Sequence, residues 1–320
     1  MADSVQKTPR LAIVVPCYNE EEVLPVTKDT LTNLVSDLIK KKKVSDDSFV
    51  AFVDDGSRDI TWKLIEQFSK ENALIKGVKL SRNFGHQGAL LAGLNTFTNS
   101  ADCVVSIDAD LQDDVKVIED MVDKYNEGFD IVYGVRNQRK TDTFFKRTTA
   151  LGFYKLMKWL GVEIIYNHAD YRLTSSRVLQ QLNNYNEVNL FLRGIFPLIG
   201  YPSTQVYYDR LERFAGESKY PLKKMLAFAF DGISSFSVKP LRMVSIIGFL
   251  VFFVSVIMAI YSLISYFYLG TVPGWTSITL PIYFISGIQI LCIGIIGEYL
   301  GKVYKEVKAR PRFVIETVLQ

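Results

Sequence analysis

The feature that most constrains the fold of this chain is a long segment without charged side chains. No Asp, Glu, Lys or Arg occurs in residues 243–297. One helix needs only about 20 apolar residues to cross a bilayer, so this segment is long enough for two crossings. A stretch containing glycine and proline, GTVPGW at 270–275, interrupts it near the middle. The pattern predicts two transmembrane helices within residues 241–301, joined by a tight turn. A buried helical hairpin of a soluble protein is the alternative.

Basic residues predict the orientation of these helices. The connecting turn carries no Lys or Arg, whereas Lys239 and Arg242 flank the start of the first helix. The basic residues that follow the second helix are Lys302, Lys305, Lys308, Arg310 and Arg312. Because positive charge stays on the cytoplasmic side, both termini are expected to face the cytoplasm. The net charge of +3 is too small to indicate a nucleic-acid partner, so none is expected.

The first 220 residues have the alternating pattern of an α/β domain. Apolar, β-branched runs at 11–15, 49–53, 75–80, 103–107 and 129–135 alternate with segments of helical periodicity. Such alternation predicts a mostly parallel sheet with helices packed on it. The glycine-rich turns of dinucleotide-binding proteins and of P-loop proteins are absent after the first run, which reads PCYNEEE. Dehydrogenase and nucleoside-triphosphatase functions are therefore excluded.

An acidic segment follows the fourth run at once. Asp108, Asp110 and Gln112 alternate, and alternating residues of an extended chain project to the same side. Two carboxylates and an amide oxygen suit Mg²⁺ or Mn²⁺ carrying a diphosphate. The carboxyl ends of parallel strands are also where ligands bind. An EF-hand would need Gly where Asp113 stands, and an aspartyl phosphatase would need Thr or Val at Gln112. A solvated acidic turn remains open for this segment alone.

Six short motifs occur in a fixed order along the chain. They are IVVPCYNE at 13–20, VDDGSRD at 53–59, SRNFGHQGALLAGL at 81–94, DADLQD at 108–113, YGVRNQR at 133–139 and RFAGESKY at 213–220. Together they resemble the inverting family 2 glycosyltransferases, in the branch that uses polyprenyl phosphates. That branch includes dolichol-phosphate mannose synthase and the bactoprenol glucosyltransferases. The resemblance implies a GT-A domain at 1–220, followed by interfacial helices and a two-helix transmembrane hairpin.

The same resemblance implies a set of donor-binding residues. Those lining the nucleotide-sugar pocket would be Pro16, Tyr18, Glu20, Asp54, Asp55 and Asp108. Asp108, Asp110 and Gln112 would hold Mg²⁺ or Mn²⁺, which neutralises charge on the departing nucleoside diphosphate. The Asp54–Asp55 pair, taken alone, is as typical of a helix cap or turn. His86 is interpreted as a packing or locally hydrogen-bonded residue.

The implied acceptor is a lipid phosphate, whose second pKa of about 6 leaves it largely ionised near neutral pH. It therefore needs positive charge around it more than it needs a general base. Arg136, Arg147 and Arg213 stand at motif positions, with Lys219 nearby, and guanidinium groups suit bidentate contact with phosphate. Asp170, in HADYRL, matches an acidic position of the family. It is expected to accept a proton or hold a sugar hydroxyl.

Two further segments are expected to contact the membrane or a sheet edge. Residues 144–160 and the amphipathic segment 221–240 have basic edges and suit the headgroup plane, with a core-facing helix as the alternative. In the cytoplasmic tail, 302–320, a helix should end before Pro311. The β-branched residues 312–319 then predict a strand that adds to a sheet edge, in its own domain or in a neighbouring subunit of a homo-oligomer. A disordered end is the alternative.

The expected function is transfer of glucose from UDP-glucose to undecaprenyl phosphate, with inversion and with metal dependence. The enzyme would be integral to a bacterial plasma membrane, with its catalytic domain in the cytoplasm. GDP-mannose, UDP-N-acetylglucosamine and an aminoarabinose donor remain open. A processive polysaccharide synthase would also show a Q-x-x-R-W stretch and more helices, and neither is in the sequence. A membrane scaffold that only binds nucleotide sugars is the non-enzymatic alternative.

Overall fold

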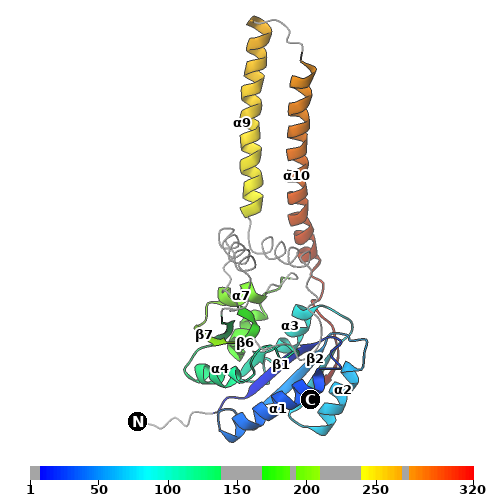
Figure 1. The fold of residues 1–320 in the computed structure, drawn as a ribbon, viewed down its shortest axis with the longest axis vertical. Helices are drawn as coiled ribbons and strands as arrows, with labels where there is room; N and C mark the ends of the chain where they lie inside the picture. Colours follow the sequence, from blue (N-terminus) through cyan, green and yellow to red (C-terminus); the bar gives the residue numbers. More distant parts are fainter. Residues whose placement is uncertain (1–7, 138–167, 188–191, 210–238, 269–273) are drawn as a thin grey trace. The chain divides into compact units, whose positions relative to one another are not determined.

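A computed structural model describes residues 8–137, 168–187, 192–209, 239–268 and 274–320 (Figure 1). The chain forms two compact units. One comprises residues 1–154, 163–220 and 310–320, and the other comprises 155–162 and 221–309. The first unit contains a β-sheet and the second contains two long helices. The predicted domain at 1–220 is thus joined in the structure by the last eleven residues of the chain, 310–320.

The sheet has eight strands in the order β7-β5-β6-β4-β1-β2-β3-β8. Their bounds are β1 Leu11–Cys17, β2 Phe49–Asp54, β3 Ile75–Leu80, β4 Cys103–Ser106, β5 Ile131–Arg136, β6 His168–Ser175, β7 Ser203–Tyr208 and β8 Ile315–Leu319. Strands β4, β1, β2 and β3 are parallel neighbours, and β5 pairs parallel with β7. Strand β6 runs antiparallel between β4 and β5. The predicted α/β class with a mostly parallel sheet is confirmed.

Alternating residues of the strands build two packed faces. The helices of this unit are α1 Leu24–Lys40, α2 Thr61–Glu71, α3 His86–Phe97, α4 Val117–Asn126, α6 Ser176–Leu182 and α7 Leu192–Ile199. Apolar residues of α1, α2 and α4 share one buried cluster with Ile13 of β1 and Phe52 of β2. On the other face, α3 lies directly against Val14 and Val53. A Cβ at Gly93 would lie 2.5 Å from Val14 Cγ1. The missing side chain therefore lets α3 approach β1 and β2 closely.

The predicted C-terminal strand is present as β8, and it pairs antiparallel with β3 of its own chain. Lys79 Nζ lies 2.9 Å from Glu316 Oε1 across this pair. Leu319 covers Gly77 beside Ile65, where a Cβ added at Gly77 would lie 3.0 Å from Leu319 Cδ1. The strand is thus part of the eight-stranded sheet. Homo-oligomer formation stays a prediction.

Deleting residues 315–320 is expected to destabilise the sheet unit by about 2 kcal/mol, because it removes one edge of the sheet and uncovers apolar atoms of β3 and α2. For a unit of this size the melting temperature should fall by about 4–8 °C. Differential scanning fluorimetry of the detergent-purified protein measures the change. Deletion of Gln320 alone, which lies beyond β8, is the control. An unchanged melting temperature after the longer deletion would show that β8 contributes no stability.

The second unit contains α9, Lys239–Tyr268, and α10, Trp275–Lys308, which contact each other. In the described part of the chain, one helical stretch, Phe284–Lys308, is long and apolar enough to cross a membrane. The predicted pair of spans therefore stays a prediction, although both long helices are present. The turn at 269–273, the segment 144–160 and all of the amphipathic segment except Lys239 and Pro240 lie outside the described residues.

Candidate functional site

The acidic segment turns sharply just beyond the carboxyl end of β4. Asp108 and Asp110 are partly exposed, whereas Gln112 and Asp113 are buried. Asp110 Oδ1 accepts the backbone N–H of Gln112 at 3.2 Å. Leu111 adopts a left-handed conformation, with φ of 51°, which costs about 1–2 kcal/mol for a residue with a Cβ. Backbone strain of this kind is concentrated at functional loops. The turn leaves the first two carboxylates accessible and directs Asp113 inward.

These carboxylates fit a divalent cation that also binds a substrate. Within the described residues, no three Asp, Glu, His or Cys side chains lie close enough together to hold a metal ion. Mg²⁺ is usually held by one or two carboxylates together with substrate phosphates and water. Asp108 and Asp110 supply two such carboxylates, so these residues fit a divalent cation. The metal site, with Gln112 as its third ligand, stays a prediction.

His86 lies between two of the predicted site carboxylates. Its Nε2 is 3.5 Å from Asp108 Oδ1 and 3.7 Å from Asp170 Oδ2. The side chain is 43% exposed and faces these two carboxylates, so of the two expected roles of His86, packing or local hydrogen bonding, the geometry favours the local polar one. It is the first residue of α3, and the close packing of that helix on β1 and β2 brings it to this edge of the sheet. Although the Asp108 side chain is 39% exposed, desolvation by the surrounding protein raises the pKa of its carboxyl, and the neighbouring His86 acts in the opposite direction.

Asp170 forms two ion pairs that the sequence did not reveal. Its Oδ1 accepts from Arg172 Nη2 at 2.7 Å, and both of its oxygens accept from Arg193, at 3.2 and 3.0 Å. Burial alone would raise the pKa of Asp170, but the charges of Arg193 and Arg172 outweigh it and hold that pKa well below its usual range. A carboxylate held in this way is a poor proton acceptor. The geometry therefore does not favour the predicted role of Asp170 as a base.

The paired aspartates after β2 shape neighbouring loops. Asp54 is fully buried and accepts the backbone N–H of Ser57 at 3.3 Å. Asp55 accepts the backbone N–H groups of Phe84 and Gly85 at 2.7 and 2.9 Å. Burial raises the pKa of both carboxyls. The two side chains thus hold the turn after β2 and the loop before α3 in place, which is the local structural role that the turn pattern had left open.

The loop after β1 provides the rest of the predicted nucleotide wall. Pro16 lies in β1, in the part of the strand that pairs with β2. Tyr18 follows just beyond the strand, and its side chain is 40% exposed. Asn19 adopts a left-handed conformation, with φ of 54°, and its Oδ1 accepts the N–H of Arg58 at 2.8 Å. Glu20 follows and is partly buried. The loops after β1 and β2 are therefore joined by a hydrogen bond at the carboxyl edge of the sheet, and the Tyr18 ring is accessible to a ligand.

The sequence of the sheet unit matches a known protein family. The family model for Glycosyl transferase family 2 matches residues 12–182, which is more than half of the chain. The chain belongs to this family. "Bactoprenol glucosyl transferase" of Shigella phage SfX is 37% identical over 96% of this chain and 99% of that protein. "Uncharacterized glycosyltransferase YkoT" of Bacillus subtilis is 57% identical over 97% of this chain and 92% of that protein. The expected resemblance to polyprenyl-phosphate glycosyltransferases is confirmed.

The sheet unit of this glycosyltransferase has a GT-A type fold. Among solved structures, glucosyl-3-phosphoglycerate synthase from Mycobacterium tuberculosis with Mn²⁺, UDP-glucose and phosphoglyceric acid is similar, with a TM-score of 0.45 and 18% identity. The similarity covers 71% of this chain and 78% of that chain.

Arg136 of the glycosyltransferase, predicted to contact the acceptor phosphate, has partners within the protein. Its Nη2 donates to Asp113 Oδ1 at 2.9 Å, and its Nε lies 3.2 Å from the Tyr208 hydroxyl oxygen. The Tyr208 hydroxyl also donates to Asp113, at 2.6 Å. Arg136 therefore neutralises a buried carboxylate, and its acceptor role stays a prediction. The other predicted acceptor-binding residues, Arg147, Arg213 and Lys219, lie outside the described residues.

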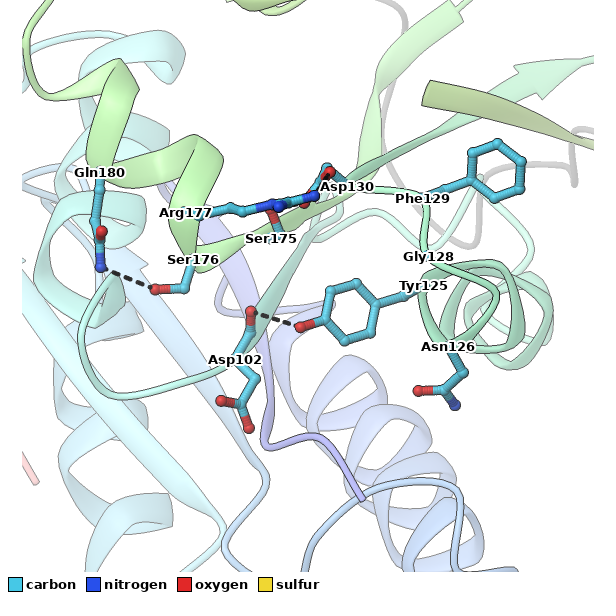
Figure 2. Close-up of a pocket in the computed structure, with 10 residues that line it drawn as sticks. All are labelled: Asp102, Tyr125, Asn126, Gly128, Phe129, Asp130, Ser175, Ser176, Arg177 and Gln180. Carbon is cyan, nitrogen blue, oxygen red and sulfur yellow. Dashed lines mark hydrogen bonds and ion pairs between the residues drawn. The ribbon is translucent and has the colours of Figure 1, made fainter. Parts of the chain in front are cut away.

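A pocket of about 500 Å³ lies at the opposite end of β4 from this site (Figure 2). It is lined by Asp102, which precedes β4, and by Ser175, which ends the antiparallel β6. In Figure 2 the Arg177 guanidinium lies beside the Asp130 carboxylate, with which it forms an ion pair. None of the predicted site residues that the structure describes lines this pocket. Because ligands of such sheets bind at the carboxyl ends of parallel strands, it is not the candidate active site.

Proposed function

We propose that this family 2 glycosyltransferase transfers glucose from UDP-glucose to a polyprenyl phosphate, with undecaprenyl phosphate as the acceptor. The observation that carries the proposal is the 37% identity to bactoprenol glucosyl transferase of phage SfX over nearly the whole of both chains. The accessible Asp108 and Asp110, beside the hydrogen-bonded pair of loops at the carboxyl edge of the sheet, support it.

The reaction is a single displacement with inversion. An oxygen of the acceptor phosphate attacks the anomeric carbon of glucose from the face opposite UDP, and the new carbon–oxygen bond forms. The bond from that carbon to the diphosphate breaks, and its electron pair leaves with UDP. Because the acceptor phosphate is already largely ionised near neutral pH, no proton has to be removed. A general base is therefore unnecessary, in keeping with the two ion pairs of Asp170.

The residues divide into a donor set and a metal set. Tyr18 offers an exposed ring to the nucleotide, with Pro16 and Glu20 beside it, while Asp54 and Asp55 hold the flanking loops. Asp108, Asp110 and Gln112 would hold Mg²⁺ or Mn²⁺. When bound, the cation supplies positive charge for the diphosphate leaving group.

The acceptor is a lipid, so the enzyme must work at a membrane surface. The apolar stretch Phe284–Lys308 supports membrane association, and the basic residues near its end favour a cytoplasmic location for the catalytic unit. We extend the proposal to an integral membrane protein anchored by α9 and α10, with both termini cytoplasmic. Assembly into a homo-oligomer remains part of the proposal.

A donor panel tests this function. Full-length protein in detergent is incubated with Mg²⁺, undecaprenyl phosphate and labelled UDP-glucose, GDP-mannose, UDP-N-acetylglucosamine or a UDP-aminoarabinose. We expect lipid-linked glucose and UDP in equal amounts, and little product from the other donors. A different preferred sugar would correct the donor. Binding of UDP-glucose without release of UDP would instead favour the scaffold.

A further inference from the structure

Two guanidinium groups share the carboxylate of Asp170. Arg172 lies two residues later on β6, so its side chain is on the same face of the strand. Arg193 reaches the same carboxylate from α7, with Nε and Nη2 on its two oxygens. The three side chains together carry one more positive than negative charge. They form a cationic cluster of defined geometry near the carboxyl edge of the sheet.

The two arginines differ in what they can reach. Arg172 is 1% exposed, and the ring of Phe196 covers its guanidinium at 4.4 Å. Its Nε and Nη1 have no hydrogen-bond partner in the part of the chain that the structure describes. Separating this ion pair with Asp170 would leave the Arg172 guanidinium buried without a counter-charge, which is strongly destabilising. Arg172 therefore holds the Asp170 carboxylate firmly. The Arg193 side chain is 32% exposed and can meet a ligand.

The cluster lies on the opposite side of β4 from the strands that carry the predicted nucleotide wall. Asp170 Oδ2 is 3.0 Å from Arg193 Nη2 and 3.7 Å from His86 Nε2, and His86 is 3.5 Å from Asp108. In the sheet order, β6 neighbours β4 on one side, whereas β1 and β2, which carry the nucleotide wall, lie on the other. An inverting transfer requires the acceptor to approach from the face opposite UDP. With UDP against β1 and β2, as the proposed function has it, the acceptor phosphate approaches from the side of Arg193.

We propose that Arg193 binds the phosphate of the lipid acceptor, and that Asp170, held by Arg172, is a positioning residue that aims Arg193 rather than a base. This inference rests on the proposed function. Guanidinium groups contact phosphate oxygens in bidentate fashion, and a carboxylate that grips one side of the group fixes its orientation. Because Arg172 also holds Asp170, the carboxylate cannot swing away when the phosphate binds.

The test combines acceptor binding with steady-state kinetics on the full chain. Geranyl phosphate, a short isoprenyl phosphate, is titrated into wild type and variants without donor, and geraniol serves as the uncharged probe. Arg193→Gln should weaken geranyl phosphate binding, and raise KM for the acceptor, by about 10- to 100-fold, the effect of one lost charged hydrogen-bonded pair. KM for UDP-glucose should not rise in parallel. Arg193→Lys keeps the positive charge but loses the paired donors of the guanidinium. Its affinity for geranyl phosphate should lie between those of Arg193→Gln and wild type.

Asp170→Asn should reproduce part of the Arg193→Gln effect, and the double variant should be no worse than Arg193→Gln alone. Arg177→Gln is the matched control, because Arg177 is also an arginine paired with a buried aspartate but lies at the pocket of Figure 2. It should leave both KM values unchanged. Melting temperatures of all variants separate loss of binding from loss of fold.

Four outcomes would overturn the inference. Unchanged geranyl phosphate binding by folded Arg193→Gln, or an equal rise in KM for both substrates, would remove Arg193 from the acceptor site. Loss of turnover in Asp170→Asn with intact acceptor binding would return Asp170 to the role of a base. Wild-type protein that binds geranyl phosphate no better than geraniol would instead overturn the proposed function, and this inference with it.

Discussion

Asp110→Asn is expected to lower turnover at least 100-fold while leaving the melting temperature unchanged. Asp110 is partly exposed beyond β4, and an amide oxygen can still accept the Gln112 N–H, so the fold of the turn survives the substitution. What is lost is the negative charge that is proposed to bind the cation. A metal ion contributes several kcal/mol to stabilising a leaving group, and each 1.36 kcal/mol is about tenfold in rate.

The measurement is glucosyl transfer at increasing Mg²⁺ or Mn²⁺, with and without excess EDTA. Asp114→Asn is the matched control. Asp114 lies in the same segment, but its carboxylate accepts the N–H of Lys116 before α4, a bond that Asn can keep. Turnover by Asp114→Asn should stay close to that of wild type. Wild-type activity that persists in EDTA, or full activity of Asp110→Asn, would end the metal role of this segment.

Arg136→Met is expected to lower the free energy of unfolding by about 3 kcal/mol, because it leaves the Asp113 carboxylate buried without its cation. Asp113 is 2% exposed, while the Arg136 side chain is 24% exposed, so the low end of the usual range for such a loss applies. The melting temperature should fall by about 6–12 °C. Tyr208→Phe removes one hydroxyl donor to the same carboxylate and should cost only about 1 kcal/mol.

A double variant distinguishes this stabilising role from the predicted acceptor role of Arg136. Asp113→Asn with Arg136→Met removes both charges and should recover part of the lost stability. Intrinsic fluorescence during unfolding in detergent measures the stability of wild type, Arg136→Met, Tyr208→Phe and the double variant. If Arg136→Met keeps its stability and shows only a raised KM for the lipid acceptor, the ion pair contributes little and Arg136 serves the acceptor instead.

Much of the sheet was predictable because its signals are local. The runs at 11–15, 49–53 and 103–107 are apolar on both faces, as strands buried between two helical layers must be. Strand β6 carries charged residues, including the buried Arg172, and its pattern does not stand out from a loop. Its antiparallel insertion between β4 and β5 depends on contacts across the sheet. The sequence likewise left undecided whether the C-terminal strand pairs with its own domain or with a neighbouring subunit, because that choice depends on the tertiary structure.

The candidate site shows the same division. Asp108 and Asp110 were predictable from their place after an apolar run, and they lie at the carboxyl end of β4. His86, Arg172 and Arg193 were missed, because each acquires its role from a carboxylate brought to it by folding. The spacing of Asp170 and Arg172 on one strand face was the only available signal. Conversely, Asp55 matched a binding motif, yet its carboxylate holds the backbone before α3.

Strand β8 also has a consequence for biosynthesis. Its partner strand β3 is made early, and the paired Lys79 and Glu316 are 237 positions apart. At about 5–20 residues per second, Lys79 is synthesised roughly 12 to 50 seconds before Glu316. Throughout that interval the growing chain exposes an unpaired edge, which chaperones must shield from other nascent chains. A stop codon at position 315 would leave that edge open permanently, even though both long helices had been completed.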